Sequence, residues 1–378
     1  MNVGRFIIRI SLFILIPLLI ALVTYRFLDR AFLAPLDHTK KNAVLVEITE
    51  GRTIKSLSQE LQQRSVLRHW WTLWFLATIS DKANKIQACE YQVSAAMTPK
   101  EILRKLTSGD VFKHTVSLKE GETISDIAKA VERAELISAS EFLRGARDRA
   151  LLATANMKSD SFEGYLFPDT YYFCRPATVK DIIWRMLKEG DKHWPPAFTE
   201  QADKLNLSRQ EILTMASMIE KESSNYEEQP LIASVLHNRL AKGMKLQSDP
   251  TVIYGMENFD GNLRPEDRDM LHPYNTYVNY GLPPGPISNP GDTAIRAALF
   301  PKETTYLYFV AKGDGNHVFS TTYQEQLVAV ELYQPGRAAG MPPPEVIATP
   351  APIAPPTPMP TPAISGKATY SISPKQRR

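Results

Sequence analysis

Two segments of the chain repeat one another at an offset of seventy positions, from Glu50 to Glu120, and this duplication limits the fold more than any other feature. Both carry a glutamate–glycine pair, then a threonine, then aliphatic residues at matching positions (Glu50/Glu120, Gly51/Gly121, Thr53/Thr123, Ile54/Ile124, Leu57/Ile127, Leu61/Val131, Val66/Leu136 and Leu67/Ile137). Alternating apolar residues before the pair predict a half-buried strand, and the threonine predicts the N-cap of an amphipathic helix. The sequence therefore predicts a duplicated strand–turn–helix unit.

Each copy resembles the LysM carbohydrate-binding module, particularly the second copy, EGETISDIAKAVERAELI. The resemblance implies a LysM-like substrate-binding region over residues 43–138. The alternative is a generic βα unit that packs without binding anything. Three tryptophans between the copies serve either to stack on sugar rings or, the more frequent role, to fill a core (Trp70, Trp71 and Trp74).

The N-terminal segment Phe6–Tyr25 is apolar apart from Arg9, Ser11 and Thr24. Twenty helical residues rise about 30 Å, which is enough to cross the apolar part of a bilayer. We predict a short cytoplasmic stub and a single transmembrane anchor within residues 1–30, followed by a linker over 31–42. A cleaved signal peptide is the alternative, although no A-x-A cleavage pattern follows the apolar run. The remaining chain is then expected on the periplasmic side of the inner (cytoplasmic) membrane.

The composition excludes several classes of partner. The net charge is only +3 and no basic stripe is present, so we expect no nucleic acid. The seven histidines are scattered and the two cysteines, Cys89 and Cys174, form no C-x-x-C pair, so we expect no metal and no cofactor. We predict that the cysteines are free, although the compartment would allow a disulfide. The proline-rich segment over 334–378 predicts a disordered tail.

One glutamate stands out in the predicted helix Glu211–Lys221. Glu220 follows Ala216 by four residues and Leu213 by seven, which places its carboxylate on the apolar stripe of the helix. Desolvation there would raise the pKa of the carboxyl, as a general acid requires. Glu222 lies roughly 200° further around the helix, so the two carboxylates cannot act as a pair on one face. The alternative for Glu220 is a buried ion pair, with Arg239 as a partner.

The segments after this helix are rich in side chains that hydrogen bond to sugars and stack on them, held on proline and glycine turns. The alternative is a turn-rich surface. The candidates for substrate binding are Asn238, Arg239, Gln247, Asp249, Thr251, Tyr254, Asn275 and Tyr277. Further on, residues 306–310 and 313–319 predict a two-stranded hairpin.

Five motifs together are similar to the YceG family over roughly residues 44–333: ASMIEKES, ASVLHNRL, GMKLQSDPTVIYG, YNTYVNYGLPPGPISNPG and YLYFVAKGDGNHVFS. The resemblance implies a mixed α+β catalytic domain over 139–333 that needs no cofactor. It implies lytic cleavage of the MurNAc–GlcNAc β-1,4 bond within nascent peptidoglycan strands, leaving 1,6-anhydro-MurNAc ends, with Glu220 as acid and base. Such an enzyme would terminate strand elongation and work beside peptidoglycan synthases.

We therefore expect an α+β ectodomain on one membrane helix, with the cleft between the LysM-like region and the catalytic domain. A non-catalytic, membrane-anchored peptidoglycan-binding protein is the first alternative, and the presence of Glu220 counts against it. A serine acyl-transfer hydrolase is the second, and the lack of G-x-S-x-G and S-x-x-K motifs counts against that.

Overall fold

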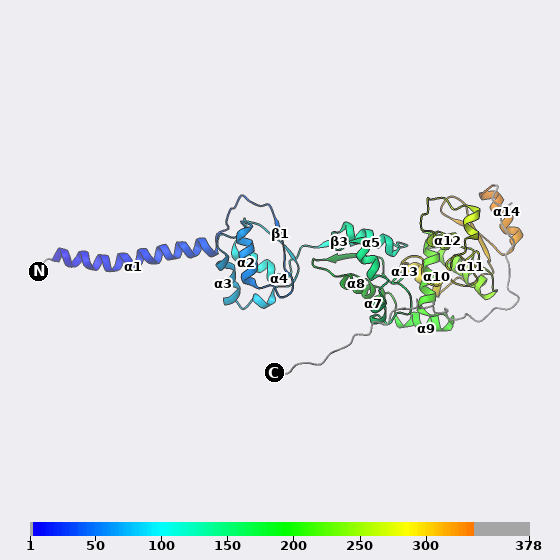
Figure 1. Ribbon diagram of the computed structural model, residues 1–378, viewed down its shortest axis with the longest axis horizontal. Coiled ribbons are helices and arrows are strands. Elements are labelled where there is room, and N and C mark those ends of the chain that lie inside the picture. The colour runs from blue at the N-terminus through cyan, green and yellow to red at the C-terminus, as the bar shows by residue number, and fades with distance from the viewer. Residues whose placement is uncertain (1–2, 336–378) are drawn as a thin grey trace, which may run out of the picture.

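A computed structural model describes residues 3–335, with side chains from residue 15 on, Asn84 excepted. The described chain is a mixed α+β protein in which helices surround three two-stranded antiparallel sheets, so the predicted α+β class is confirmed (Figure 1). From residue 336 the predicted proline-rich tail lies outside the described residues.

The chain begins with one long helix, α1 (Val3–Phe32), which extends away from the rest of the molecule (Figure 1). Among the residues that the structure describes, we find no helix that combines the length and the apolar character needed to cross a membrane. The end of α1 packs on the tryptophan cluster: Trp71 stacks on Phe27 and meets Phe32 edge-on. Trp71 thus contributes to packing, as the more frequent role of such clusters predicts.

The first repeat begins a unit with its own core. Its elements are β1 (Val44–Glu47), α2 (Ile54–Gln63), α3 (Trp70–Ile79), the 3-10 turn η1 (Ala83–Lys85), β2 (Glu90–Val93) and α4 (Pro99–Ser108). Strands β1 and β2 are antiparallel, with Val44 opposite Val93. Leu57, Leu61 and Tyr91 are buried between the sheet and the helices.

The second repeat begins a similar unit. Its elements are β3 (His114–Ser117), α5 (Ile124–Arg133), α6 (Ala139–Gly145), α7 (Arg149–Thr154), β4 (Thr170–Phe173) and α8 (Val179–Lys192). Thr53 and Thr123 both cap their helices, and Gly51 and Gly121 share a φ of +78°, so the predicted duplication is confirmed. One core joins residues from Val116 to Met186, so it crosses the domain boundary that we place after residue 138.

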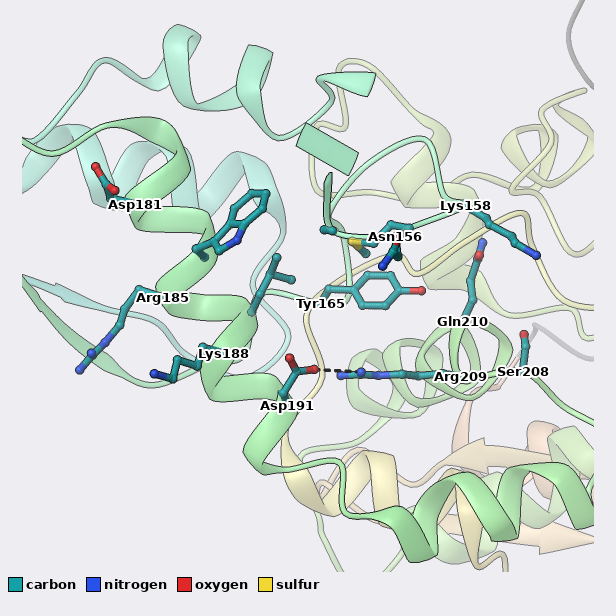
Figure 2. Close-up of a pocket in the computed structure, with 14 residues that line it drawn as sticks. Asn156, Lys158, Tyr165, Asp181, Arg185, Lys188, Asp191, Ser208, Arg209 and Gln210 are labelled. Carbon is teal, nitrogen blue, oxygen red and sulfur yellow. Dashed lines mark hydrogen bonds and ion pairs between the residues drawn. The ribbon is translucent and has the colours of Figure 1, made fainter. Parts of the chain in front are cut away.

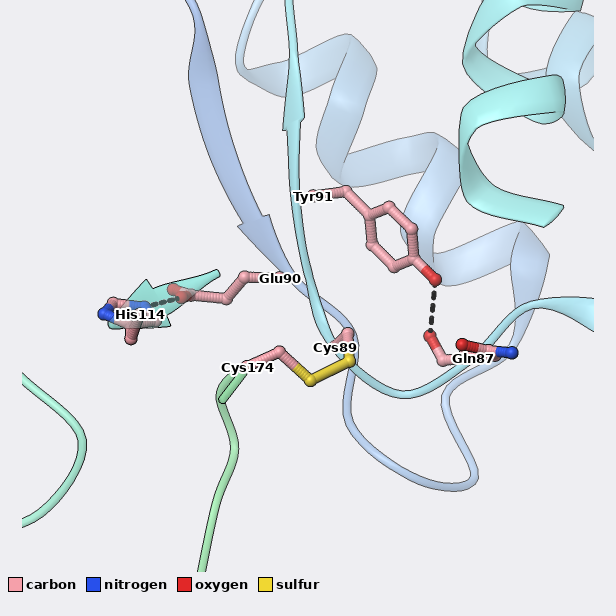
Figure 3. Close-up of a disulfide and its surroundings, with 6 residues drawn as sticks. All are labelled: Gln87, Cys89, Glu90, Tyr91, His114 and Cys174. Carbon is pink, nitrogen blue, oxygen red and sulfur yellow. Dashed lines mark hydrogen bonds and ion pairs between the residues drawn. A yellow bond between two sulfur atoms is a disulfide. The ribbon is translucent and has the colours of Figure 1, made fainter. Parts of the chain in front are cut away.

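A disulfide between Cys89 and Cys174 joins the two units, and our prediction of free cysteines is wrong (Figure 3). The cysteines are 85 positions apart; Cys89 directly precedes β2, Cys174 directly follows β4, and their Cα atoms lie 5.4 Å apart. Beside it, the buried carboxylate of Glu90 accepts hydrogen bonds from His114 Nε2 (2.6 Å) and from Arg175 Nη2 (2.8 Å). A covalent bond and an ionic network therefore hold the first unit to the second.

The third unit is built around α10 (Arg209–Glu222), which packs against α11 (Gln229–Ala241) and α13 (Asp292–Leu299). Ser208 and Glu211 form a capping box at its start, and residues 212–219 are all buried. A helix, α12 (Asp249–Gly255), forms where the sequence predicted only a turn at Pro250. The predicted hairpin is confirmed as the antiparallel pair of β5 (Tyr308–Ala311) and β6 (His317–Ser320). The remaining elements are α9 (Pro196–Lys204), η2 (Pro265–Asp269) and α14 (Tyr323–Tyr333).

Candidate active site

Glu220 lies near the end of α10, where the buried part of the helix meets the second unit. Its carboxylate is half-buried, and Oε2 accepts a hydrogen bond from the backbone N–H of Gly291 at 3.0 Å. Gly291 is the residue just before α13, so the carboxylate also lies at the positive end of that helix dipole. The carboxylate is therefore oriented by backbone from another part of the chain.

The Glu-Gly turn of the second repeat borders this carboxylate. A Cβ added at Gly121 would lie 3.4 Å from Glu220 Cγ, an ordinary van der Waals contact, so the turn lies directly against the Glu220 side chain. The turn is anchored to the loop that carries Gly291: Gly121 N–H donates to Asn289 O, and Asn289 N–H donates to Glu122 O, both at 2.9 Å. Glu220 therefore lies at the junction of the second and third units.

Burial raises the pKa of the Glu220 carboxyl above its ordinary value. The Gly291 N–H and the Lys221 ammonium oppose this shift, whereas the negative charge of Glu120 adds to it. A raised pKa keeps a larger fraction of the carboxyl protonated near neutral pH, which suits a proton donor. Glu120 itself accepts a hydrogen bond from the Tyr226 hydroxyl at 2.9 Å.

Glu222 points to a different environment, so the two carboxylates do not form a pair. Its Oε1 accepts a hydrogen bond from Ser248 Oγ at 2.5 Å. Burial raises the pKa of Glu222 to about 7. Arg239, the suggested ion-pair partner of Glu220, instead donates to the carbonyls of Leu307 (2.6 Å) and Leu246 (2.8 Å). The buried ion pair with Arg239 is therefore not how Glu220 is held.

Several predicted substrate-binding side chains are used in bonds within the protein. Tyr277 donates to Asp249 Oδ1 at 2.6 Å, and the guanidinium of Arg268 donates to both carboxylate oxygens of Asp249 at 3.1 Å. Asn238 Nδ2 donates to two carbonyls that precede β5, and Gln247 Oε1 accepts from Arg239. These bonds order the polar loops around the end of α10.

Thr251 and Asn275 are fully buried. Thr251 Oγ1 donates to Ser248 O at 2.6 Å, and Asn275 Nδ2 donates to Arg268 O and Met270 O. Both side chains are buried and used in bonds within the protein, so any part they have in substrate binding would be to hold the loops in place, and their role in substrate binding stays a prediction. A sequence shows which polar residues lie on turns, but not which of them form the hydrogen bonds that hold their own turn together.

Sequence reasoning missed a buried carboxylate that supports the site. Glu163 accepts hydrogen bonds from Ile124 N–H (3.0 Å), from Asn289 Nδ2 (3.0 Å) and from the hydroxyl of Tyr254 (3.2 Å). Asn289 Oδ1 accepts in turn from the backbone of Gly164. Glu163 and Asn289 therefore join the second repeat to the loop of Gly291. The sequence offered only a weak signal for Glu163, namely a Glu-Gly pair like those at positions 50 and 120.

A cavity of about 830 Å³ lies elsewhere, between α8 and the start of α10 (Figure 2). Its lining includes Tyr165 and Trp184, and Arg209 pairs with Asp191 at 2.9 Å on its wall. It contains none of the predicted site residues, so cavity size does not mark the candidate site. Among the described residues, no group of three or more acidic, histidine or cysteine side chains could hold a metal ion.

Comparison with known proteins shows that the chain matches a protein family. The model of the YceG-like family matches residues 46–332, which is most of the chain. The chain belongs to the YceG-like family. This family assignment agrees with the resemblance seen in the five motifs.

Relatives of this YceG-like chain have been named for an activity. An endolytic murein transglycosylase of Bacillus subtilis (strain 168) is 32% identical over 320 residues, covering 80% of this chain and 88% of the relative. One of Streptococcus pneumoniae serotype 2 (strain D39) is 30% identical, covering 78% of this chain and 58% of the relative. A crystal structure of a yceG-like protein from Listeria monocytogenes matches with 33% identity and a TM-score of 0.53, covering 76% of this chain and 98% of that chain.

Proposed function

We propose that this chain is an endolytic lytic transglycosylase that cleaves the MurNAc–GlcNAc β-1,4 bond within peptidoglycan strands, with Glu220 as its acid and base. The single observation that carries the proposal is the placement of Glu220, half-buried, oriented by Gly291 N–H and with a raised pKa. The names of the Bacillus and Streptococcus relatives support the same substrate.

The chemistry requires one carboxyl group. Protonated Glu220 gives its proton to the glycosidic oxygen as the bond from C1 to that oxygen breaks. The C6 hydroxyl of the same MurNAc then attacks C1, and the Glu220 carboxylate takes up the hydroxyl proton. The products are a free GlcNAc hydroxyl and a 1,6-anhydro-MurNAc end, and no water is consumed.

Digestion of purified glycan strands by the full chain and by Glu220→Gln tests this proposal, with products read by mass spectrometry. Wild type is expected to yield 1,6-anhydro ends and Glu220→Gln none. Reducing ends instead would show a hydrolase, and Glu120 would then be the first candidate for the second carboxylate. Binding without cleavage by both proteins would favour the non-catalytic peptidoglycan-binding protein.

We further propose that α1 anchors the enzyme in the inner membrane with the three units on the periplasmic side, beside the synthases that extrude nascent strands. Apolar side chains of α1 such as Leu18 and Leu19 are exposed to more than 60%. The Cys89–Cys174 disulfide is typical of an oxidising compartment. Protease added outside intact spheroplasts should degrade the units. Full protection would contradict this topology.

A further inference from the structure

Glu120 brings a second carboxylate to Glu220 from a distant part of the chain. Two contacts define the position of the Glu120 carboxylate. The hydroxyl of Tyr226 donates to Glu120 Oε2 at 2.9 Å. The Glu120 carboxylate also packs against Gly291, where an added Cβ would overlap it. Because Gly291 also donates its N–H to Glu220, one glycine is flanked by both carboxylates. Glu120 is exposed and is therefore not part of a core.

Three elements present titratable groups to Glu220. The turn after β3 presents Glu120, α10 itself presents Lys221, and the segment after α10 presents Tyr226. Lys221 Nζ points to the carbonyl of Gly121 at 3.3 Å, so part of its charge is directed to the turn. Burial is the largest cause of the raised pKa of Glu220, and the charge of Glu120 acts in the same direction.

We propose that Glu120, held by Tyr226, is a positioning residue for Glu220 and extends the pH range over which Glu220 can donate its proton. This inference rests on the proposed glycan cleavage. The fixed negative charge opposes ionisation of Glu220 before the substrate is cut. After the first proton transfer, repulsion between the two carboxylates favours the return of a proton to Glu220, here from the C6 hydroxyl. One charge thus assists the completion of the cycle.

The duplication offers a matched control. Glu50 occupies the corresponding position in the first unit, before a glycine with the same φ of +78°. It is exposed on the same kind of turn but lies in the unit that does not border Glu220. Glu50→Gln therefore removes the same charge from the same local structure at a different place.

The experiment measures kcat/KM for release of 1,6-anhydro ends against pH for the full-length wild type, Glu120→Gln, Tyr226→Phe and Glu50→Gln. Loss of the Glu120 charge lowers the pKa of Glu220, so the acid form is lost at a lower pH. Because Glu120 is exposed, we expect the alkaline limb of Glu120→Gln to move down by roughly half a pH unit, with a roughly threefold loss of activity at pH values above the limb. Tyr226→Phe should shift the limb the same way by less, and Glu50→Gln should keep the wild-type profile.

An alkaline limb that stays in place in Glu120→Gln, or moves to higher pH, would overturn the inference. So would an equal loss at every pH, because a merely structural role predicts that pattern. Melting temperatures of the variants confirm that each is folded. A folded wild type that cleaves at no pH would instead reject the proposed function, and this inference with it.

Discussion

The Gly291 N–H and the Glu220 carboxylate are joined by a hydrogen bond of 3.0 Å across 71 positions of the chain. The donor is a backbone group on a loop whose Asn289 is hydrogen bonded to the turn of the second repeat. Such a donor cannot rotate away as a side chain can, so the carboxylate is oriented before a substrate arrives. This bond makes the site depend on packing between units.

Gly291→Ala should disturb the site without unfolding the protein. Gly291 has a φ of −81°, which alanine adopts without strain, but its Cβ would overlap the carboxylate of Glu120. We expect Glu120 to be displaced, with the alkaline limb of activity moving to lower pH as in Glu120→Gln. Kinetics against pH and thermal unfolding check this.

The double variant Gly291→Ala with Glu120→Ala provides the control, because it removes the group that the new Cβ would meet. Its activity should be close to that of Glu120→Ala alone, since both changes act by removing the Glu120 carboxylate from its place beside Gly291. Fully additive losses would show that Gly291 acts by another route.

Glu222→Gln should cost far less activity than Glu220→Gln. Loss of a general acid typically costs roughly 10²- to 10⁴-fold. The amide oxygen of the introduced glutamine would still accept the Ser248 hydrogen bond that Glu222 accepts now, so we expect a loss within about tenfold. Parallel rates on the same strands check this. A loss of activity in Glu222→Gln that exceeds the loss in Glu220→Gln would assign the role of the acid to Glu222 instead.

Glu163→Gln should flatten the dependence of stability on pH. Burial raises the pKa of Glu163 to about 8, above its ordinary value of 4.5. The folded state therefore binds one more proton than the unfolded state between these pH values, and this group makes stability fall as pH rises through that window. The slope approaches about 1.4 kcal/mol per pH unit for one group. Urea unfolding from pH 5 to 8 measures it.

Glutamine suits this site because its Oε1 can accept from Ile124 N–H and from Asn289, while its amide donates to the Tyr254 oxygen. We therefore expect Glu163→Gln to remain folded. An identical slope in wild type and variant would show that Glu163 stays ionised over this range.

Replacing both cysteines with serine should loosen the first unit and leave the site in place. The disulfide closes a loop between positions 85 apart, and loss of such a bond typically costs about 2–4 kcal/mol. Denaturant unfolding measures the loss of stability.

Cleavage of soluble strands by the double cysteine variant should persist, because Glu220 lies between the second and third units. Peptide mass spectrometry without reduction should detect the Cys89–Cys174 crosslink in wild type, and its absence would contradict the structure.

Local patterns in the sequence were sufficient for the individual elements. Thr53 and Thr123 cap the two repeated helices as predicted, and Ser208 caps α10. The alternating residues after position 306 form the β5–β6 hairpin. Each of these features depends on residues within a few positions of one another, where capping, glycine turns and apolar spacing act. The stripe position of Glu220 on α10 follows from the same periodicity.

Contacts between distant segments were decided only by the tertiary structure. Cys89 and Cys174 pair because two separate sheets end beside one another. Glu120 reaches Gly291 because Asn289 binds the repeated turn, and Asn275 is buried because its own loop uses its amide. The sequence by itself determined which helix carries Glu220 and which turns are repeated. Packing between the units decided which charges and donors surround the Glu220 carboxylate, because such contacts depend on how whole cores fit together.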